Sequence, residues 1–315
     1  MNSSPCVILF GAGASKYSGG LNTQPPLGNE LIEKLAERFP DTWGDRWGIK
    51  IESFIPDFEK GMTELIRVMD RSGGDYSQYL RDLARFFSQF KIENPSENYY
   101  YKLITDIMPI IKQERIVLSS LNYDCILEDA INQFIPIYKI NPFTNPIGPM
   151  VIKPHGSCNY FIEMSNIHIT ERAMTTGSSA KINGTPICVD RMDVDQYCKP
   201  NMFPPILSLY DVYKTTMSGN NVISAIRKHL ALILHNAPQI AIVGVKPIDH
   251  DVHIWTPLKE ARGNLIMVNP DSDGMCEEWL QKYRRGKKDR LINKGFKDSI
   301  SEISRALYTS ILPSG

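Results

Sequence analysis

Residues 6–15 read Cys-Val-Ile-Leu-Phe-Gly-Ala-Gly-Ala-Ser, an uninterrupted apolar run that leads into a glycine-rich turn. Five apolar residues without a polar one indicate a strand buried on both faces, which is typical of parallel sheets. The glycines allow a sharp turn and a close approach of the backbone to a bound group. This stretch therefore predicts an α/β fold in which ligand contacts follow the strand.

Four more apolar runs have the same character. They are Ile116–Leu118, Val151-Ile152, Ile240–Val243 and Leu265–Val268, and each is followed by a polar or glycine-containing turn. The carboxyl ends of parallel strands meet at one edge of a sheet, where α/β proteins hold their ligands. The sequence thus predicts a Rossmann-like parallel sheet with its site at that edge.

The stretch between the first two strands has a helical pattern. Apolar residues at three- and four-residue spacing predict four helices, over Leu27–Phe39, Pro56–Met69, Tyr76–Phe90 and Glu97–Lys112. So long a stretch exceeds one crossover helix. We therefore predict a helical module, residues 28–113, inserted into a Rossmann core of residues 1–27 and 114–273, with a C-terminal helical segment over residues 274–315.

The remaining chain carries separate signals. Helices are predicted over Asp124–Phe134 and Asn221–Asn236, while the pattern weakens from Ile167 to Pro205. Within that weak region, the small and polar residues Thr175–Lys181 predict a mobile loop.

Composition narrows the class of protein. The apolar share of 42% and the charged share of 22% in 315 residues are ordinary for a globular protein and argue against wholesale disorder. Lys plus Arg and Asp plus Glu are 35 each, so no net charge favours nucleic acid or an anionic membrane. Six cysteines without paired spacing indicate reduced thiols. No stretch has the length of a signal-peptide core or a membrane span, so the expected location is the cytoplasm.

The second motif, Leu121-Asn122-Tyr123-Asp124, places an amide and a carboxylate after a strand. In an extended segment Asn122 and Asp124 point the same way, which suits a ribose or a carboxamide. The alternative is an Asx cap, with Asp124 as the N-cap of the helix that follows.

The third motif is Lys153-Pro154-His155-Gly156-Ser157. An imidazole titrates near neutrality, so His155 is a candidate general base, the alternative being a structural loop histidine. His250 and His253 are also of ligand type. Because no Cys or Glu partner stands beside them, the sequence predicts no metal site.

In this order, the motifs resemble the Sir2-like (sirtuin-related) superfamily. The series is Gly-Ala-Gly-x-Ser, Asn-Tyr-Asp and Pro-His-Gly-Ser, then Val243-Gly244 and Val268-Asn269-Pro270, over roughly residues 6–270. The resemblance implies a Sir2-like Rossmann fold that binds NAD.

The resemblance also implies roles for residues. Asn122 would position the attacking water beside the nicotinamide ribose, Asp124 would hold the carboxamide, and His155 would be the general base. Gly244 would lie near the ribose and phosphates, and Asn269 would contact the adenosine ribose. The NAD pyrophosphate would be wrapped by Gly11, Ala12, Gly13 and Ser15.

Departures from the deacylating sirtuins narrow the expected activity. Those enzymes carry a zinc ribbon of two Cys-x-x-Cys pairs, which Cys158, Cys188 and Cys198 cannot supply, so no zinc ribbon is expected. Gln24-Pro25-Pro26 stands where they have Asp-Phe-Arg. Gly244-Val245-Lys246 replaces their Gly-x-Ser, so that Lys246 offers a charge for phosphate in place of a hydroxyl.

With these departures, the sequence resembles the bacterial Sir2-like enzymes of anti-phage defence. That likeness implies an NAD+ hydrolase that yields nicotinamide and ADP-ribose, with NAD as substrate and no metal required. It also implies a homo-oligomer and a separate sensor protein, of which a HerA-type ATPase is the expected kind, so that nucleic acid would be met only indirectly.

Three alternatives stay open. The same pocket would serve an NAD-dependent protein deacylase or ADP-ribosyltransferase, or a non-catalytic module that senses NAD or ADP-ribose. The basic cluster Lys282–Arg290 is either a nucleic-acid contact or a solvated helix end.

Overall fold

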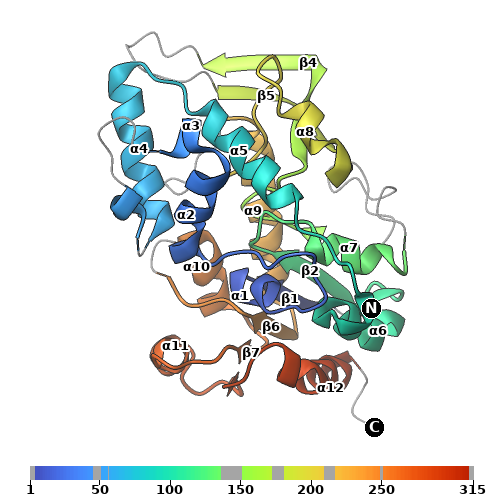
Figure 1. The fold of residues 1–315 in the computed structure, drawn as a ribbon. Helices are drawn as coiled ribbons and strands as arrows, with labels where there is room; N and C mark the ends of the chain where they lie inside the picture. The colour runs from blue at the N-terminus through green and yellow to red at the C-terminus, as the bar shows by residue number, and fades with distance from the viewer. Residues whose placement is uncertain are drawn as a thin grey trace.

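The structure is a computed structural model that describes residues 4–44, 51–55, 57–135, 151–171, 181–208, 217–248 and 251–311 (Figure 1). Residues 175–180 of the predicted mobile loop lie outside these ranges, and Lys181 begins a strand. No helix among the described residues is both long and apolar enough to cross a bilayer.

A six-stranded sheet with all strand pairs parallel forms the centre of the molecule, in the order β3-β2-β1-β6-β7-β8. β2 and β3 lie on one side of β1, and β6, β7 and β8 lie on the other, which is the Rossmann arrangement. The predicted α/β, Rossmann-like sheet is therefore confirmed. The strands are β1 Cys6–Phe10, β2 Ile116–Ser120, β3 Val151–Ile152, β6 Gln239–Val243, β7 Asn264–Val268 and β8 Arg290–Ile292.

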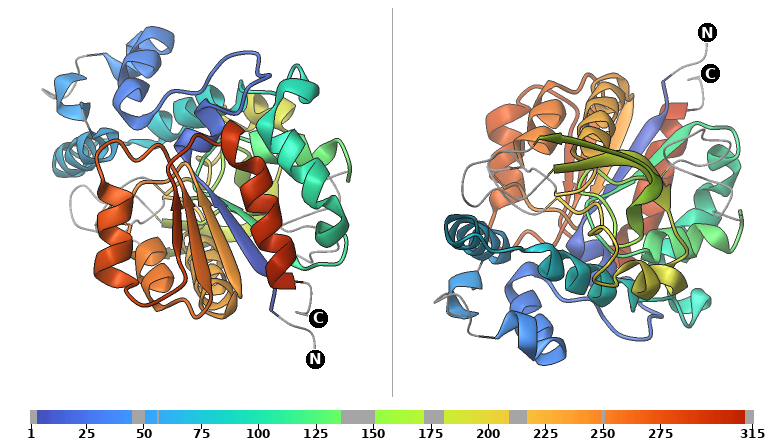
Figure 2. Two further views of the ribbon diagram at one scale, coloured as in Figure 1. Left: turned by 90° about the horizontal axis from the view of Figure 1, so that it is seen from below. Right: turned by 90° about the horizontal axis from the view of Figure 1, so that it is seen from above.

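The central strand β1 is buried on both faces, as its unbroken apolar run predicts. Ile8 and Phe10 belong to one hydrophobic cluster, and Val7 and Leu9 belong to a second on the opposite face. Such alternation follows from the two-residue period of a strand. The sheet is thus the middle of three layers, with helices on both sides (Figure 2).

Different helices build the two outer layers. On the face of Phe10 lie α6 (Tyr99–Ile111), α7 (Ile126–Asn132) and α12 (Ile300–Ile311). On the other face lie α9 (Asn220–Asn236), α10 (Val252–Glu260) and α11 (Met275–Tyr283), through residues such as Leu234 and Trp255.

The four helices predicted between the first two strands are confirmed to within a few residues at each end. They are α2 Gly28–Arg38, α4 Phe58–Ser72, α5 Ser77–Ser88 and α6. Helix α6 lies directly on the sheet, where the Tyr100 ring packs 4.9 Å from that of Phe10. The division into a core, a helical module and a C-terminal segment stays a prediction.

The weak pattern after Ile167 conceals a β-hairpin that the sequence did not predict. β4 (Tyr160–Glu171) and β5 (Lys181–Cys188) form a separate antiparallel sheet. Their register shifts between Ile162 and Ile167, and a shift of register breaks the two-residue alternation by which a strand is recognised.

The C-terminal segment adds a strand to the helices predicted there. β8 is only three residues long and lies between α11 and α12 at the edge of the sheet. It begins with the charged Arg290 and none of its residues is fully buried, so it lacks the apolar run that predicts a buried strand. Short helices complete the fold, with α1 Ala12–Lys16, α3 Pro40–Trp43 and α8 Val194–Tyr197.

Arg284 is a structural member of the basic cluster Lys282–Arg290. Its side chain is buried and its Nε lies 2.8 Å from Asp289 Oδ2, while its other nitrogens donate to the carbonyl oxygens of Ala261 and Gly263. It therefore ties the end of α11 to the turn between α10 and β7. The neighbouring Arg285 is exposed.

We expect Arg284→Gln to lower the free energy of unfolding by about 3–5 kcal/mol, because it removes one partner of a buried ion pair. The matched variant Arg285→Gln is exposed and should stay within about 0.5 kcal/mol of the parent. Urea unfolding of the two variants measures the difference. Equal midpoints would show that Arg284 does not hold these elements together.

Candidate functional site

Two turns meet at the edge of the sheet where the strand order reverses, one after β1 and one after β6. The Gly11 amide donates to Val243 O at 3.0 Å, and the Gly13 amide donates to Gly244 O at 3.1 Å. A Cβ on Gly11 would lie 2.6 Å from Val245 Cγ2 and 2.7 Å from Gly244 O. The first glycine of the predicted motif is therefore required by backbone packing.

Gly244 is constrained in two ways. Its φ of +67° lies in the left-handed region that side chains disfavour. A Cβ there would also lie 2.3 Å from the backbone nitrogen of Ala14. The turn after β6 consequently fits against α1 only with glycine at this position.

Asn122 is fixed to the first turn through its amide nitrogen. Nδ2 donates to Gly11 O at 2.9 Å and to Ser15 Oγ at 2.7 Å. Because Gly11 O can only accept, the nitrogen must face it, and this fixes which way the amide points.

Tyr100, which the sequence did not single out, supports this arrangement from α6. Its hydroxyl lies 3.1 Å from Ser15 Oγ. Burial raises the pKa of the Tyr100 phenol well above its ordinary value, and the nearby Asp124 carboxyl adds to the rise. The phenol is therefore neutral, and no pattern in the sequence connects it with Ser15.

Asp124 is buried beside Asn122. Its Oδ1 accepts from the Ile126 amide at 3.0 Å, while the N-cap of α7 is Cys125. The alternative reading of Asp124 as N-cap is therefore off by one residue, although the side chain does bind the first turn. Burial raises the pKa of the Asp124 carboxyl, and the Lys153 ammonium opposes this rise.

Lys153 joins the second and third motifs from a fully buried position. Its Nζ lies 2.9 Å from Glu128 Oε1 and 2.9 Å from Ser157 Oγ, and it also donates to Asp124 O. Burial alone would lower the pKa of Lys153. The Glu128 carboxylate and other neighbouring groups together outweigh burial, so the pKa is raised. The ammonium stays charged and holds the two segments together.

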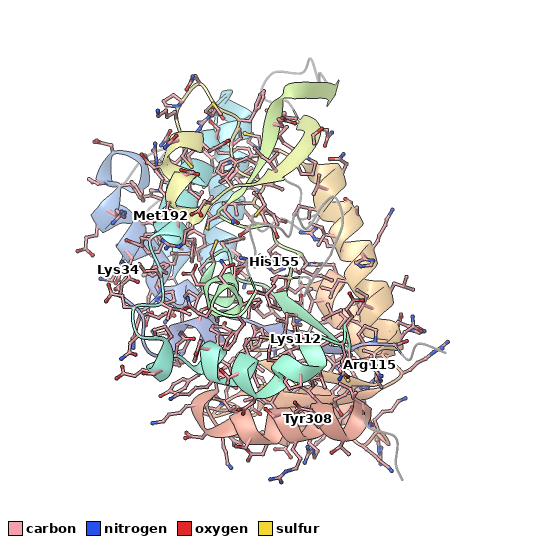
Figure 3. All side chains as sticks on the ribbon, turned by 90° about the vertical axis from the view of Figure 1, so that its right-hand side faces the viewer. Lys34, Lys112, Arg115, His155, Met192 and Tyr308 are labelled. Atoms are coloured by element: carbon pink, nitrogen blue, oxygen red, sulfur yellow. The ribbon has the colours of Figure 1, made fainter. Side chains whose placement is uncertain are left out.

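His155 lies in the interior of the molecule and is 5% exposed (Figure 3). Its Nε2 is 2.9 Å from His253 Nε2 and 3.8 Å from Asp251 Oδ1. No sequence pattern pairs His253 with His155, because the two lie 98 positions apart. His250, the other histidine considered with it, lies outside the described residues.

A cleft of about 940 Å³ collects much of the predicted site. Its volume is in the range of small-molecule sites. Helices α2 and α4 supply another part of its lining, including Leu31, Phe58 and Met62. The predicted site residues that line it are Ala12, Ser15, Asn122, Asp124 and His155.

The other predicted site residues lie in the turns after β1, β6 and β7, which contact one another. They are Gly11, Gly13, Gly244 and Asn269. Asn269 follows β7, and its Nδ2 donates to Val245 O at 3.2 Å. Lys246 reaches the cleft and pairs with Asp273, whose pKa this hydrogen bond lowers. A cation of the type that binds phosphate thus lies at the cleft, already paired with a carboxylate.

Comparisons with known proteins give remote likenesses. No family model and no curated protein matches the chain. A mutant Sir2 homologue in complex with ADP-ribose is 14% identical with a TM-score of 0.47, covering 98% of this chain and 94% of that one. A Sir2 homologue–NAD complex is 16% identical with a TM-score of 0.43, covering 99% and 92%. At these identities and TM-scores, the likeness does not by itself establish the fold. The fold is assigned from the strand order of the sheet.

We expect Gly244→Ala to destabilise the protein more than Gly274→Ala. Both glycines have positive φ, which costs an alanine about 1–2 kcal/mol. Around Gly274 a Cβ meets nothing within 4 Å, whereas at Gly244 it meets backbone. Forced contact should add a further ~1–3 kcal/mol, measured by urea unfolding. An equal loss of unfolding free energy in both variants would mean that the turns after β1 and β6 can move apart to accept the Cβ.

Proposed function

We propose that the cleft binds NAD+ and hydrolyses the bond between nicotinamide and ribose, giving nicotinamide and ADP-ribose. The observation that carries this proposal is the presence of Asn122 and His155 in one cleft with Ser15. The cleft lies at the point where the strand order reverses, which is where Rossmann sheets bind dinucleotides.

The pyrophosphate is proposed to lie against the glycine turn. Ala12 and Ser15 line the cleft, and the turn has no large side chain to obstruct a phosphate. The amides of Gly13 and Ala14 donate to carbonyl oxygens, so they stabilise the turn that receives the ligand. Gly11 completes that turn.

The riboses are proposed to lie between this turn and the strands that follow. Gly244 follows β6 and would lie near the ribose and the phosphates. Asn269 follows β7 and would contact the adenosine ribose. Asp124 would accept a hydrogen bond from the carboxamide of nicotinamide.

The reaction needs a directed water and a proton acceptor. Cleavage sends the electron pair of the C–N bond to nicotinamide and leaves positive charge on the ribose. Asn122 Oδ1 accepts a hydrogen bond from water while Nδ2 stays bound to Gly11 O and Ser15 Oγ. As the water oxygen bonds to the ribose carbon, the His155 imidazole takes its proton. This route uses no metal.

We further propose that NAD depletion serves anti-phage defence in the cytoplasm. The support is the resemblance of the motif series, with its departures from the deacylating enzymes, to that group. A homo-oligomer and a separate HerA-type ATPase would then control the cleft, and its wall from α2 and α4 is a natural place for such control to act.

The first test is NAD consumption by the purified chain, alone and with a candidate HerA-type ATPase, without any peptide. His155→Ala and Asn122→Ala should each lower kcat by about 10²–10⁴-fold, the range for loss of a general acid–base group. The exposed His229→Ala is the matched control and should turn over like the parent. Chromatography of nicotinamide and ADP-ribose provides the readout.

Binding is measured separately, by the rise in Tm with added NAD. His155→Ala should retain this rise, because the histidine acts on the water. NAD binding without turnover under every condition would favour the sensing module. Nicotinamide release that appears only with an acylated peptide would favour the deacylase.

A further inference from the structure

Three side chains of metal-binding type converge beside the cleft. His155 follows β3, Asp251 is the N-cap of α10, and His253 lies in the first turn of that helix. One ligand atom from each lies within 4.8 Å of the others. His155 and Asp251 are both at least nine-tenths buried. From this cluster, we propose that these residues form a binding site for a divalent transition metal of the zinc type.

The distances suit such an ion. Zinc–nitrogen bonds of about 2.0–2.1 Å in a tetrahedron place ligand atoms roughly 3.3 Å apart. The two Nε2 atoms are 2.9 Å apart, and His155 Nε2 lies 3.8 Å from Asp251 Oδ1. These separations bracket the required value, so small side-chain rotations convert the cluster into a coordination site.

The chemistry of the ligands points to the same class of ion. Two imidazoles and one carboxylate are ligands that zinc and neighbouring transition metals accept. Where two Nε2 atoms face each other this closely, one of them must carry a proton, since two lone pairs repel. A cation between them satisfies both lone pairs at once. Mg²⁺ is excluded because it prefers oxygen ligands in an octahedron.

The cluster meets the cleft at one of its three ligands. Of the three ligands, His155 lines the cleft. Zinc sites with three protein ligands keep a fourth position for water or another small ligand. The cluster therefore has an entry path for the ion from the cleft.

Metal occupancy has a consequence for turnover, which rests on the proposed function. A bound cation takes the Nε2 lone pair of His155, and the neutral imidazole then carries its hydrogen on Nδ1, so neither nitrogen accepts a proton. Zinc should therefore inhibit NAD hydrolysis, and a chelator should restore it.

Cobalt provides the direct test, because tetrahedral Co²⁺ has intense visible absorption bands. The full chain, stripped with a chelator, should bind one Co²⁺ per chain, which Zn²⁺ displaces and Mg²⁺ does not. The absence of a thiolate-to-cobalt band in the near ultraviolet would separate this site from the free cysteines.

The variants locate the site. His253→Gln should weaken Co²⁺ binding by more than about 100-fold, beyond the range of changes that only support a ligand. Asp251→Asn is a second variant of the same shape, and Asp251 makes no side-chain cap bond that the change would remove. His229→Gln is the matched control and should bind as the parent does. Circular dichroism verifies that each variant is folded.

The outcomes are separable from those of the NAD assay. Absence of visible bands, or bands unchanged in both His253→Gln and Asp251→Asn, would overturn the metal site. Turnover unaffected by saturating Zn²⁺ would overturn the inhibition. Because the spectrum is read without substrate, a chain that binds Co²⁺ but never consumes NAD refutes the hydrolase and leaves the metal site standing.

Discussion

The site depends on the close approach of two backbone turns, one after β1 and one after β6. Gly11 and Gly244 make this approach possible, since a Cβ on either would meet atoms closer than any normal contact. Once the turns are in contact, Gly11 O is in place to receive Asn122 Nδ2 at 2.9 Å. The orientation of the Asn122 amide thus follows from glycine packing on the neighbouring strand.

A second layer of constraint comes from one buried ammonium. Lys153 contacts Asp124 O, Glu128 and Ser157, which belong to segments on both sides of residues 136–150. Burying a charge is costly unless it is paired and hydrogen-bonded, and here both conditions are met. The same lysine therefore fixes the distance between the Asn-Tyr-Asp and His-Gly-Ser motifs.

The parts of the fold that the sequence predicted are those whose signal is local. Buried strands such as β1 are recognised by an uninterrupted apolar run, and long amphipathic helices such as α5 by apolar residues at three- and four-residue spacing. β8 was missed because it begins with the charged Arg290 and has no fully buried residue. The β4–β5 hairpin was missed because a register shift breaks the alternation of its strands. For the candidate site, the motifs pointed to Asn122 and His155, which line one cleft in the structure.

What the sequence could not supply was contact between distant residues. Neither Tyr100 beside Ser15 nor His253 beside His155 has any signature, because each pair depends on how helices α6 and α10 dock on the sheet.

The two proposed catalytic residues are held by different kinds of contact, and this decides where the site is sensitive to its surroundings. Asn122 is bound by a backbone carbonyl and a serine hydroxyl, neither of which changes charge near neutral pH. His155 instead contacts an imidazole and lies near a carboxylate, and both of these exchange protons and bind cations. Changes in the ionic surroundings would therefore act on His155, the proposed proton acceptor, and leave the Asn122 amide in place. Control through His155 would alter the rate of the chemical step without dismantling the pocket that holds the substrate.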